Sequence, residues 1–151
     1  MTTPTLRRTA WHEAGHAVVA WDQRFTVTFV SIRPDGISLG RSQHTPVADC
    51  ALRSERQRAC IVAMGGWAAE HASGEANDGV TYDSADFSWV SSRISEHAPS
   101  RLEIELGWAE SEAEPIVSAN KDRVERLADE LIKREELSDA DEILAIIEGG
   151  P

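Results

Sequence analysis

The chain has 151 residues, enough for one domain with its own core, and its 41% hydrophobic and 27% charged residues are ordinary for a soluble globular protein. The formal net charge of −11 argues against nucleic-acid binding, which needs a basic surface to neutralise phosphates. No apolar stretch approaches the roughly 20 residues that cross a bilayer, and no signal peptide is apparent, so we expect a cytoplasmic protein without membrane insertion.

The first half of the chain predicts a helix, a β-hairpin and a second helix. Thr3 before Pro4 is typical of a helix start, and turn residues separate two runs with the spacing of strands. Gly65 and Gly66 interrupt the second helix. Because each costs about 1 kcal/mol against alanine there, they indicate close packing or a functional role. The expected elements are a helix over about residues 5–21, strands over 26–32 and 37 to about 44, and a helix over about 49–73.

The second half predicts helices only. The pattern between Pro99 and Glu112 is weak, whereas an apolar stripe marks a long amphipathic helix after it. Ser138, with Asp141 three residues on, resembles a capping box at the start of the last helix. The expected helices cover about residues 81–97, 112–133 and 138–147. The sequence thus predicts a mainly α fold with one small β-hairpin, as a compact helical domain over residues 1–151.

His12, Glu13 and His16 form a His-Glu-x-x-His pattern within the first expected helix. Residues four apart share one helix face, so both imidazoles can point at one metal ion. Glu13 lies one step around the helix, where it can accept a proton from a zinc-bound water. Apolar residues surround the pattern, and polar side chains on an apolar helix need partners. The pattern therefore predicts zinc-dependent hydrolysis with Glu13 as the catalytic base.

A catalytic zinc site uses three protein ligands, and the third is normally distant in the sequence. No His-x-x-Gly-x-x-His extension follows the pattern, which excludes the third-histidine arrangement of the metzincins. Residue chemistry by itself leaves Glu70, Asp83 and Asp86 open. The full set of candidates is His44, Glu70, His71, Asp83, Asp86 and His97.

Residues 12–19, His-Glu-Ala-Gly-His-Ala-Val-Val, resemble the metal-binding helix of the FtsH-type zinc peptidases, the proteolytic domains fused to AAA ATPases. Further segments are similar to that family in the same order: residues 30–34, 38–40, 64–70, 79–83 and 129–143. The likeness covers most of the chain. It implies a zinc metallopeptidase domain with Asp83 as the third zinc ligand. It gives Glu70 the role of orienting a ligating histidine, while Asp86, one helical turn beyond Asp83, is the fallback ligand.

The resemblance also implies a polypeptide substrate, unfolded or extended, and the expected strand at residues 37 to about 44 offers an edge with which it could pair. His44, near the end of that strand, could stabilise the oxyanion. No P-loop motif occurs, so we expect a peptidase domain that stands alone, without an ATPase or a transmembrane segment in this chain. Whether a separate ATPase is a partner, and which oligomer forms, stay open.

Two other functions are compatible with the pattern. One is a catalytically silent binding or regulatory module of the same fold, in which zinc is structural or absent. The other is a zinc hydrolase that acts on a non-peptide amide. Glu13 favours an enzyme, because a structural zinc site has no use for a general base.

Overall fold

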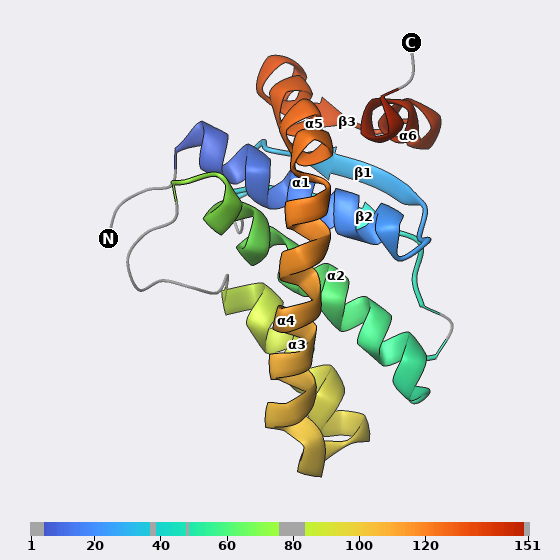
Figure 1. The fold of residues 1–151 in the computed structure, drawn as a ribbon. Helices are drawn as coiled ribbons and strands as arrows, with labels where there is room; N and C mark the ends of the chain where they lie inside the picture. The colour runs from blue at the N-terminus through green and yellow to red at the C-terminus, as the bar shows by residue number, and fades with distance from the viewer. Residues whose placement is uncertain (1–4, 37–38, 48, 76–83, 150–151) are drawn as a thin grey trace.

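Helices dominate the computed structural model, which describes residues 5–36, 39–47, 49–75 and 84–149 (Figure 1). The prediction of a mainly α fold is therefore confirmed. Among the described residues, no helix has the length and apolar content needed to cross a membrane. The elements are α1 Leu6–Asp22, β1 Val27–Ser31, β2 Arg41–His44, α2 Arg53–Ala72, α3 Ser84–His97, the 3-10 turn η1 Pro99–Arg101, α4 Leu102–Ala119, α5 Lys121–Arg134, β3 Glu136–Leu137 and α6 Ala140–Glu148.

The sheet has three antiparallel strands in the order β2-β1-β3, so the expected hairpin is only part of it. β1 pairs with β2 as the sequence predicts, although β2 begins at Arg41, and residues 37–38 of the expected strand lie outside the described residues. The third strand pairs Leu137 with Val30. With only two residues, β3 is too short to show the alternation by which a strand is recognised. Its position leaves β2 at one edge of the sheet.

α1 lies at the centre of the described fold. Every residue from 10 to 20 is buried, because α2, α5 and the strands pack around this helix (Figure 1). The contact with α2 is close: a Cβ added at Gly15 would lie 2.4 Å from Ala69 Cβ and 2.5 Å from the Gly65 carbonyl oxygen. Gly15 and Gly65 thus allow the two backbones to meet, as the interrupted helical pattern indicates.

The long helix expected over residues 112–133 is two helices, and this correction has a local cause. α4 already begins at Leu102, and the helical path ends at Asn120, whose side-chain amide donates to the Ile116 carbonyl at 2.8 Å. The Asn120 backbone N–H donates to the same carbonyl at 3.1 Å, so the side-chain amide adds a second hydrogen bond at the end of α4. Arg123 Nε donates to the Asn120 side-chain oxygen at 3.1 Å and holds the junction from the α5 side.

α6 also begins differently from the prediction. Its N-cap is Asp139 rather than Ser138, since the Asp139 carboxylate accepts hydrogen bonds from the backbone N–H groups of Asp141 and Glu142. A carboxylate at this position suits the positive end of the helix dipole. The expected capping box was one residue out of register.

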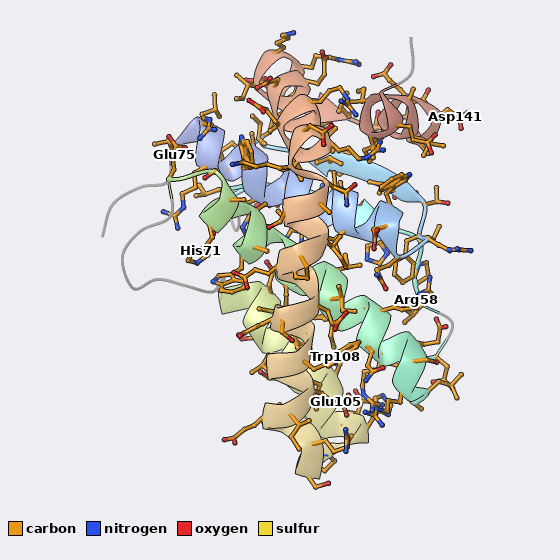
Figure 2. All side chains as sticks on the ribbon, in the orientation of Figure 1. Arg58, His71, Glu75, Glu105, Trp108 and Asp141 are labelled. Atoms are coloured by element: carbon orange, nitrogen blue, oxygen red, sulfur yellow. The ribbon has the colours of Figure 1, made fainter. Side chains whose placement is uncertain are left out.

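A buried ion pair joins α4 to α2. Arg56 Nε and Nη2 donate to the two carboxylate oxygens of Glu105 at 2.9 and 3.1 Å, and both side chains are less than 5% exposed. Arg101 Nε lies 3.3 Å from the same carboxylate. Glu105 lies in the first turn of α4 (Figure 2), and Arg56 lies near the start of α2. Burial raises the pKa of Glu105, but Arg56 and Arg101 outweigh it and hold that pKa below its ordinary value.

Candidate metal centre

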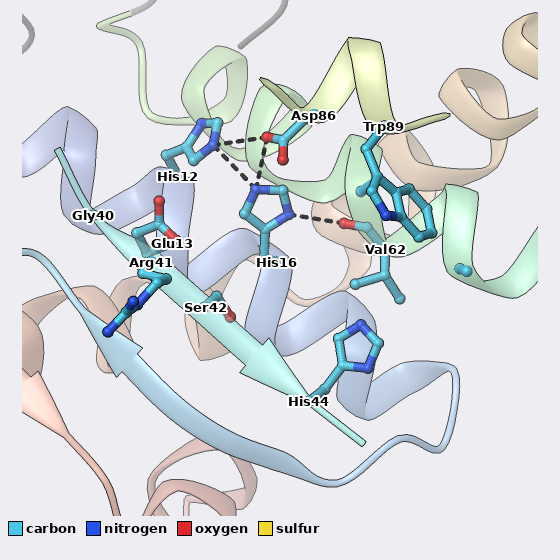
Figure 3. Close-up of a pocket in the computed structure, with 12 residues that line it drawn as sticks. His12, Glu13, His16, Gly40, Arg41, Ser42, His44, Val62, Asp86 and Trp89 are labelled. Atoms are coloured by element: carbon cyan, nitrogen blue, oxygen red, sulfur yellow. Dashed lines mark hydrogen bonds and ion pairs between the residues drawn. The ribbon is translucent and has the colours of Figure 1, made fainter. Parts of the chain in front are cut away.

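Three side chains from two helices converge at one point. His12 and His16 lie on successive turns of α1, and Asp86 lies in the first turn of α3. The two Nε2 atoms are 3.0 Å apart, and Asp86 Oδ2 lies 3.2 Å from His12 Nε2 and 3.0 Å from His16 Nε2 (Figure 3). Within the described ranges, no other group of three or more His, Cys, Asp or Glu side chains comes together in this way.

These distances fit a zinc ion. Ligand atoms on a tetrahedron with zinc bonds of about 2.0–2.1 Å lie about 3.3 Å apart. The three separations of 3.0, 3.2 and 3.0 Å are close to that value. Two imidazoles and one carboxylate also form a set of donors that zinc favours, and three protein ligands leave a fourth position for water or substrate.

The outer nitrogen of each imidazole faces an acceptor. His16 Nδ1 donates to the Val62 carbonyl at 2.9 Å, and His12 Nδ1 lies 3.5 Å from Glu70 Oε2. A proton on Nδ1 leaves the Nε2 lone pair free for a metal, so these acceptors select the ligating tautomer. Both partners come from α2, which ties the metal-facing side of α1 to its neighbouring helix.

The site is electrostatically coupled. Burial lowers the pKa of His12, but the hydrogen bonds with Asp86 and Glu70 outweigh it and raise that pKa well above the ordinary histidine value. Burial likewise lowers the pKa of His16, and the Asp86 charge reverses the shift. Burial raises the pKa of Asp86, yet the two imidazoles hold it below its usual range. The carboxylates therefore favour positive charge at this point, whether it is carried by protons or by a metal ion.

Two glycines make room for the cluster. A Cβ at Gly66 would lie 2.6 Å from both His12 Nε2 and His16 Nε2, so only glycine lets α2 approach the metal-facing atoms. At the entrance to β2, a Cβ at Gly40 would lie 2.8 Å from Glu13 Cγ. Glycine is a costly residue inside a helix, as the sequence analysis notes for Gly66. Its position beside both imidazoles explains why glycine is needed there.

Glu13 shares a cavity with the cluster. The cavity has a volume of about 330 Å³ and is lined by Glu13, the three converging side chains and residues of β2. Glu13 is only 7% exposed. Figure 3 shows β2 running past Glu13 toward His44, with Trp89 of α3 on the opposite side. A carboxylate in this position can act on a water in the same cavity.

Five of the six candidate third ligands lie among the described residues. Asp86 faces both histidines, whereas Asp83 lies outside the described residues, so its assignment stays a prediction. His44 lines the cavity and packs its ring 4.5 Å from that of Phe25. His71 lies near the end of α2 (Figure 2), where it packs against Trp67. His97 is the last residue of α3 and lies beside Glu96. Neither His71 nor His97 belongs to the group of converging side chains.

Arg8 is a part of the site's surroundings that the sequence did not reveal. Its Nε donates to Glu70 Oε1 at 2.8 Å, and the residue is 8% exposed. Arg8 precedes His12 by four residues and so shares its helix face. The four-residue spacing from His12 was the one sign in the sequence that Arg8 lies near the site. It does not identify the distant carboxylate, Glu70, that Arg8 contacts.

The residues of this centre fall within a region that matches a known protein family. A model of peptidase family M41 matches residues 1–96, which include His12, Glu13, His16, Glu70 and Asp86. The chain belongs to this family. M41 membership confirms the expected resemblance to FtsH-type peptidase domains.

One relative is the ATP-dependent zinc metalloprotease FtsH 1 of Rhodopirellula baltica. The two sequences are 28% identical over an alignment of 177 positions, which spans 89% of this chain and 26% of the relative. The M41 chain therefore spans about a quarter of the length of that protein.

Proposed function

We propose that this protein is a zinc-dependent metalloendopeptidase with His12, His16 and Asp86 as the metal ligands and Glu13 as the general base. The observation that carries the proposal is the convergence of two Nε2 atoms and one carboxylate oxygen at separations of 3.0–3.2 Å beside Glu13. Membership of family M41 supports it. Asp83 stays the competing assignment for the third ligand.

The residues divide the chemistry between them. A zinc ion held here would supply Lewis acidity, which lowers the pKa of water and polarises the peptide carbonyl. Glu13 accepts the proton that the attacking water loses and returns it to the leaving amine. Val62 and Glu70 hold the imidazoles in the ligating tautomer. The low exposure of these side chains strengthens each electrostatic contact.

The substrate is an extended polypeptide that pairs with β2. This strand lies at the edge of the sheet, and its residues Arg41, Ser42 and His44 line the cavity that contains Glu13. A chain added to a sheet edge gains main-chain hydrogen bonds whatever its sequence. Such binding places a peptide bond beside the proposed metal centre and suits unfolded substrates.

The proposal is tested by metal analysis combined with proteolysis. The purified protein is expected to hold one zinc per chain and to cleave an unfolded model protein. Cleavage should stop when a chelator removes the metal and resume when zinc is restored. Protein that binds no zinc contradicts the proposal. Zinc-loaded protein that cleaves no unfolded protein or peptide favours a binding or regulatory module, and cleavage restricted to non-peptide amides favours a different hydrolase.

Three single substitutions separate the ligand assignments. Asp86→Ala is expected to weaken zinc binding by more than Glu70→Ala, because loss of a direct ligand exceeds the roughly 10–100-fold cost of losing a group that orients one. Asp83→Ala is expected to leave zinc affinity near the wild-type value. Competition with a chelating dye measures all three. The reverse order, with Asp83→Ala the most damaging variant, would show that Asp83 is the third ligand.

Gly66→Ala tests the space between α2 and the cluster. The new Cβ would lie 2.6 Å from both Nε2 atoms, so the rings must move, and zinc affinity is expected to fall about 10–100-fold. Gly107→Ala is the matched control, since this helical glycine of α4 has no heavy atom within 4 Å of an added Cβ. The control should stabilise the protein by up to about 1 kcal/mol and leave zinc affinity unchanged. Equal zinc affinity in both variants would contradict the geometry.

A further inference from the structure

A chain of contacts runs from the start of α1 to the proposed metal centre. Arg8 Nε donates to Glu70 Oε1 at 2.8 Å, and the other oxygen of the same carboxylate lies 3.5 Å from His12 Nδ1. His12 Nε2 in turn faces Asp86 and His16. Arg8 therefore reaches the metal-facing atoms through one carboxylate and one imidazole.

The contacts are nearly dry. The side chains of Arg8, Glu70 and His12 are 10%, 13% and 9% exposed. In such surroundings a charged hydrogen bond is stronger than in water, and a carboxylate without a partner is costly to bury. The guanidinium thus stabilises the ionised Glu70 carboxylate and fixes its rotation. Without that bond the carboxylate is free to turn away from the His12 ring toward solvent.

The helix geometry shows why this arrangement couples to the site. Arg8 and His12 lie four residues apart on one face of α1, so Glu70 of α2 meets both from the side. If the bond between Arg8 and Glu70 only joined the two helices, the second Glu70 oxygen would have no reason to face His12, a proposed metal ligand. Arg7, the neighbouring residue, makes such an ordinary link: it donates to the Ser73 carbonyl at 2.9 Å and lies 3.6 Å from Glu75.

We propose that Arg8 is a positioning residue for the metal centre, which holds Glu70 so that this carboxylate orients His12 and raises zinc affinity. The inference rests on the proposed zinc site and adds a residue that acts on it through Glu70. It assigns to Arg8 a role in metal binding in addition to its tie between α1 and α2.

The test is a double-mutant cycle read by zinc affinity. Arg8→Met keeps the length of the side chain but removes the donors, and it is expected to weaken zinc binding about tenfold, within the range for groups that orient ligands. In a Glu70→Gln background the same substitution should cause no further loss, because both changes interrupt one chain of contacts. The His12 Nδ1 proton resonance of the zinc-loaded protein should also shift in Arg8→Met, as its acceptor moves.

Arg7→Met is the matched control and should leave zinc affinity and the His12 resonance unchanged. Two results would overturn the inference and leave Arg8 with a structural role only. One is an equal loss of zinc affinity from Arg8→Met in both backgrounds, and the other is a lower unfolding temperature with unchanged zinc affinity. If Arg8→Met does not fold, Arg8→Leu, which also lacks a donor, takes its place in the cycle with the same criterion. Wild-type protein that binds no zinc would overturn the proposed function and this inference together, whereas tight wild-type binding with an unaffected Arg8→Met variant overturns the inference alone.

Discussion

Glu13→Gln is expected to keep its zinc and its fold while losing about 10²–10⁴-fold in the rate of peptide hydrolysis. Gln has nearly the shape of Glu and retains a hydrogen-bonding oxygen, but it cannot accept the proton that water must lose. Glu13 is not among the converging ligand atoms, although it lines the same cavity, so its loss should affect turnover and not metal binding. Zinc content and cleavage of an unfolded model protein, measured on the same samples, check both parts.

Glu75→Gln is a suitable control because Glu75 lies near the end of α2, where it accepts a hydrogen bond from Thr5 and pairs with Arg7 away from the cavity. This control should retain the wild-type rate. Wild-type hydrolysis by a zinc-loaded Glu13→Gln protein would refute the assigned role of Glu13. Loss of zinc from Glu13→Gln would show instead that Glu13 takes part in holding the metal.

Glu105→Ala is expected to lower the free energy of unfolding by about 3–5 kcal/mol, the usual cost of removing one partner of a buried ion pair. The Arg56 side chain is 4% exposed and would keep its charge without the carboxylate that accepts two of its hydrogen bonds. Denaturant unfolding in the presence of a chelator measures the difference and keeps metal binding out of the comparison. Glu103→Ala, an exposed acid on the same helix, should change stability by less than about 0.5 kcal/mol.

The Glu105 prediction carries a pH dependence with a definite sign. Because the pKa of Glu105 is held below its ordinary value, its stabilising contribution is present above the unfolded-state pKa of about 4.3 and is lost as the pH falls through the folded-state value. The difference between wild type and Glu105→Ala should therefore shrink in acid. Replacing both partners, as in Arg56→Met with Glu105→Leu, should recover much of the lost stability. A double variant as unstable as Glu105→Ala would argue that packing at α4, and not the unpaired charge, is the cause.

Local patterns in the sequence predicted the elements and the central motif. Helix spacing brings His12 and His16 to one face of α1 without any tertiary contact, because each turn depends on neighbouring residues only. The hairpin was recognisable for the same reason, from alternation and turn residues. Errors appeared where local signals were weak or ambiguous: at Asn120, which lies between α4 and α5, and at the two-residue strand β3.

The third member of the cluster, a carboxylate, could not be identified from such patterns. Asp83 and Asp86 are both acids near the expected start of one helix, and nothing local distinguishes them. The position of α3 against α1 brings Asp86, 74 residues from His12, to within 3.2 Å of its Nε2. Asp86 was the fallback in the sequence interpretation, and the resemblance to FtsH-type peptidases pointed to Asp83.

The sequence by itself thus determined the secondary structure near the motif, the two histidines with their neighbouring base, and the family. Only the tertiary structure showed that Asp86 meets the histidines, that Arg8 meets Glu70 and that Gly66 lets α2 approach the imidazoles. Arg8 and Glu70 are 62 residues apart, and Arg56 and Glu105 are 49 apart. Periodicity carries information over a few residues, whereas these pairs form because packing of whole helices and closure of long loops bring their side chains together.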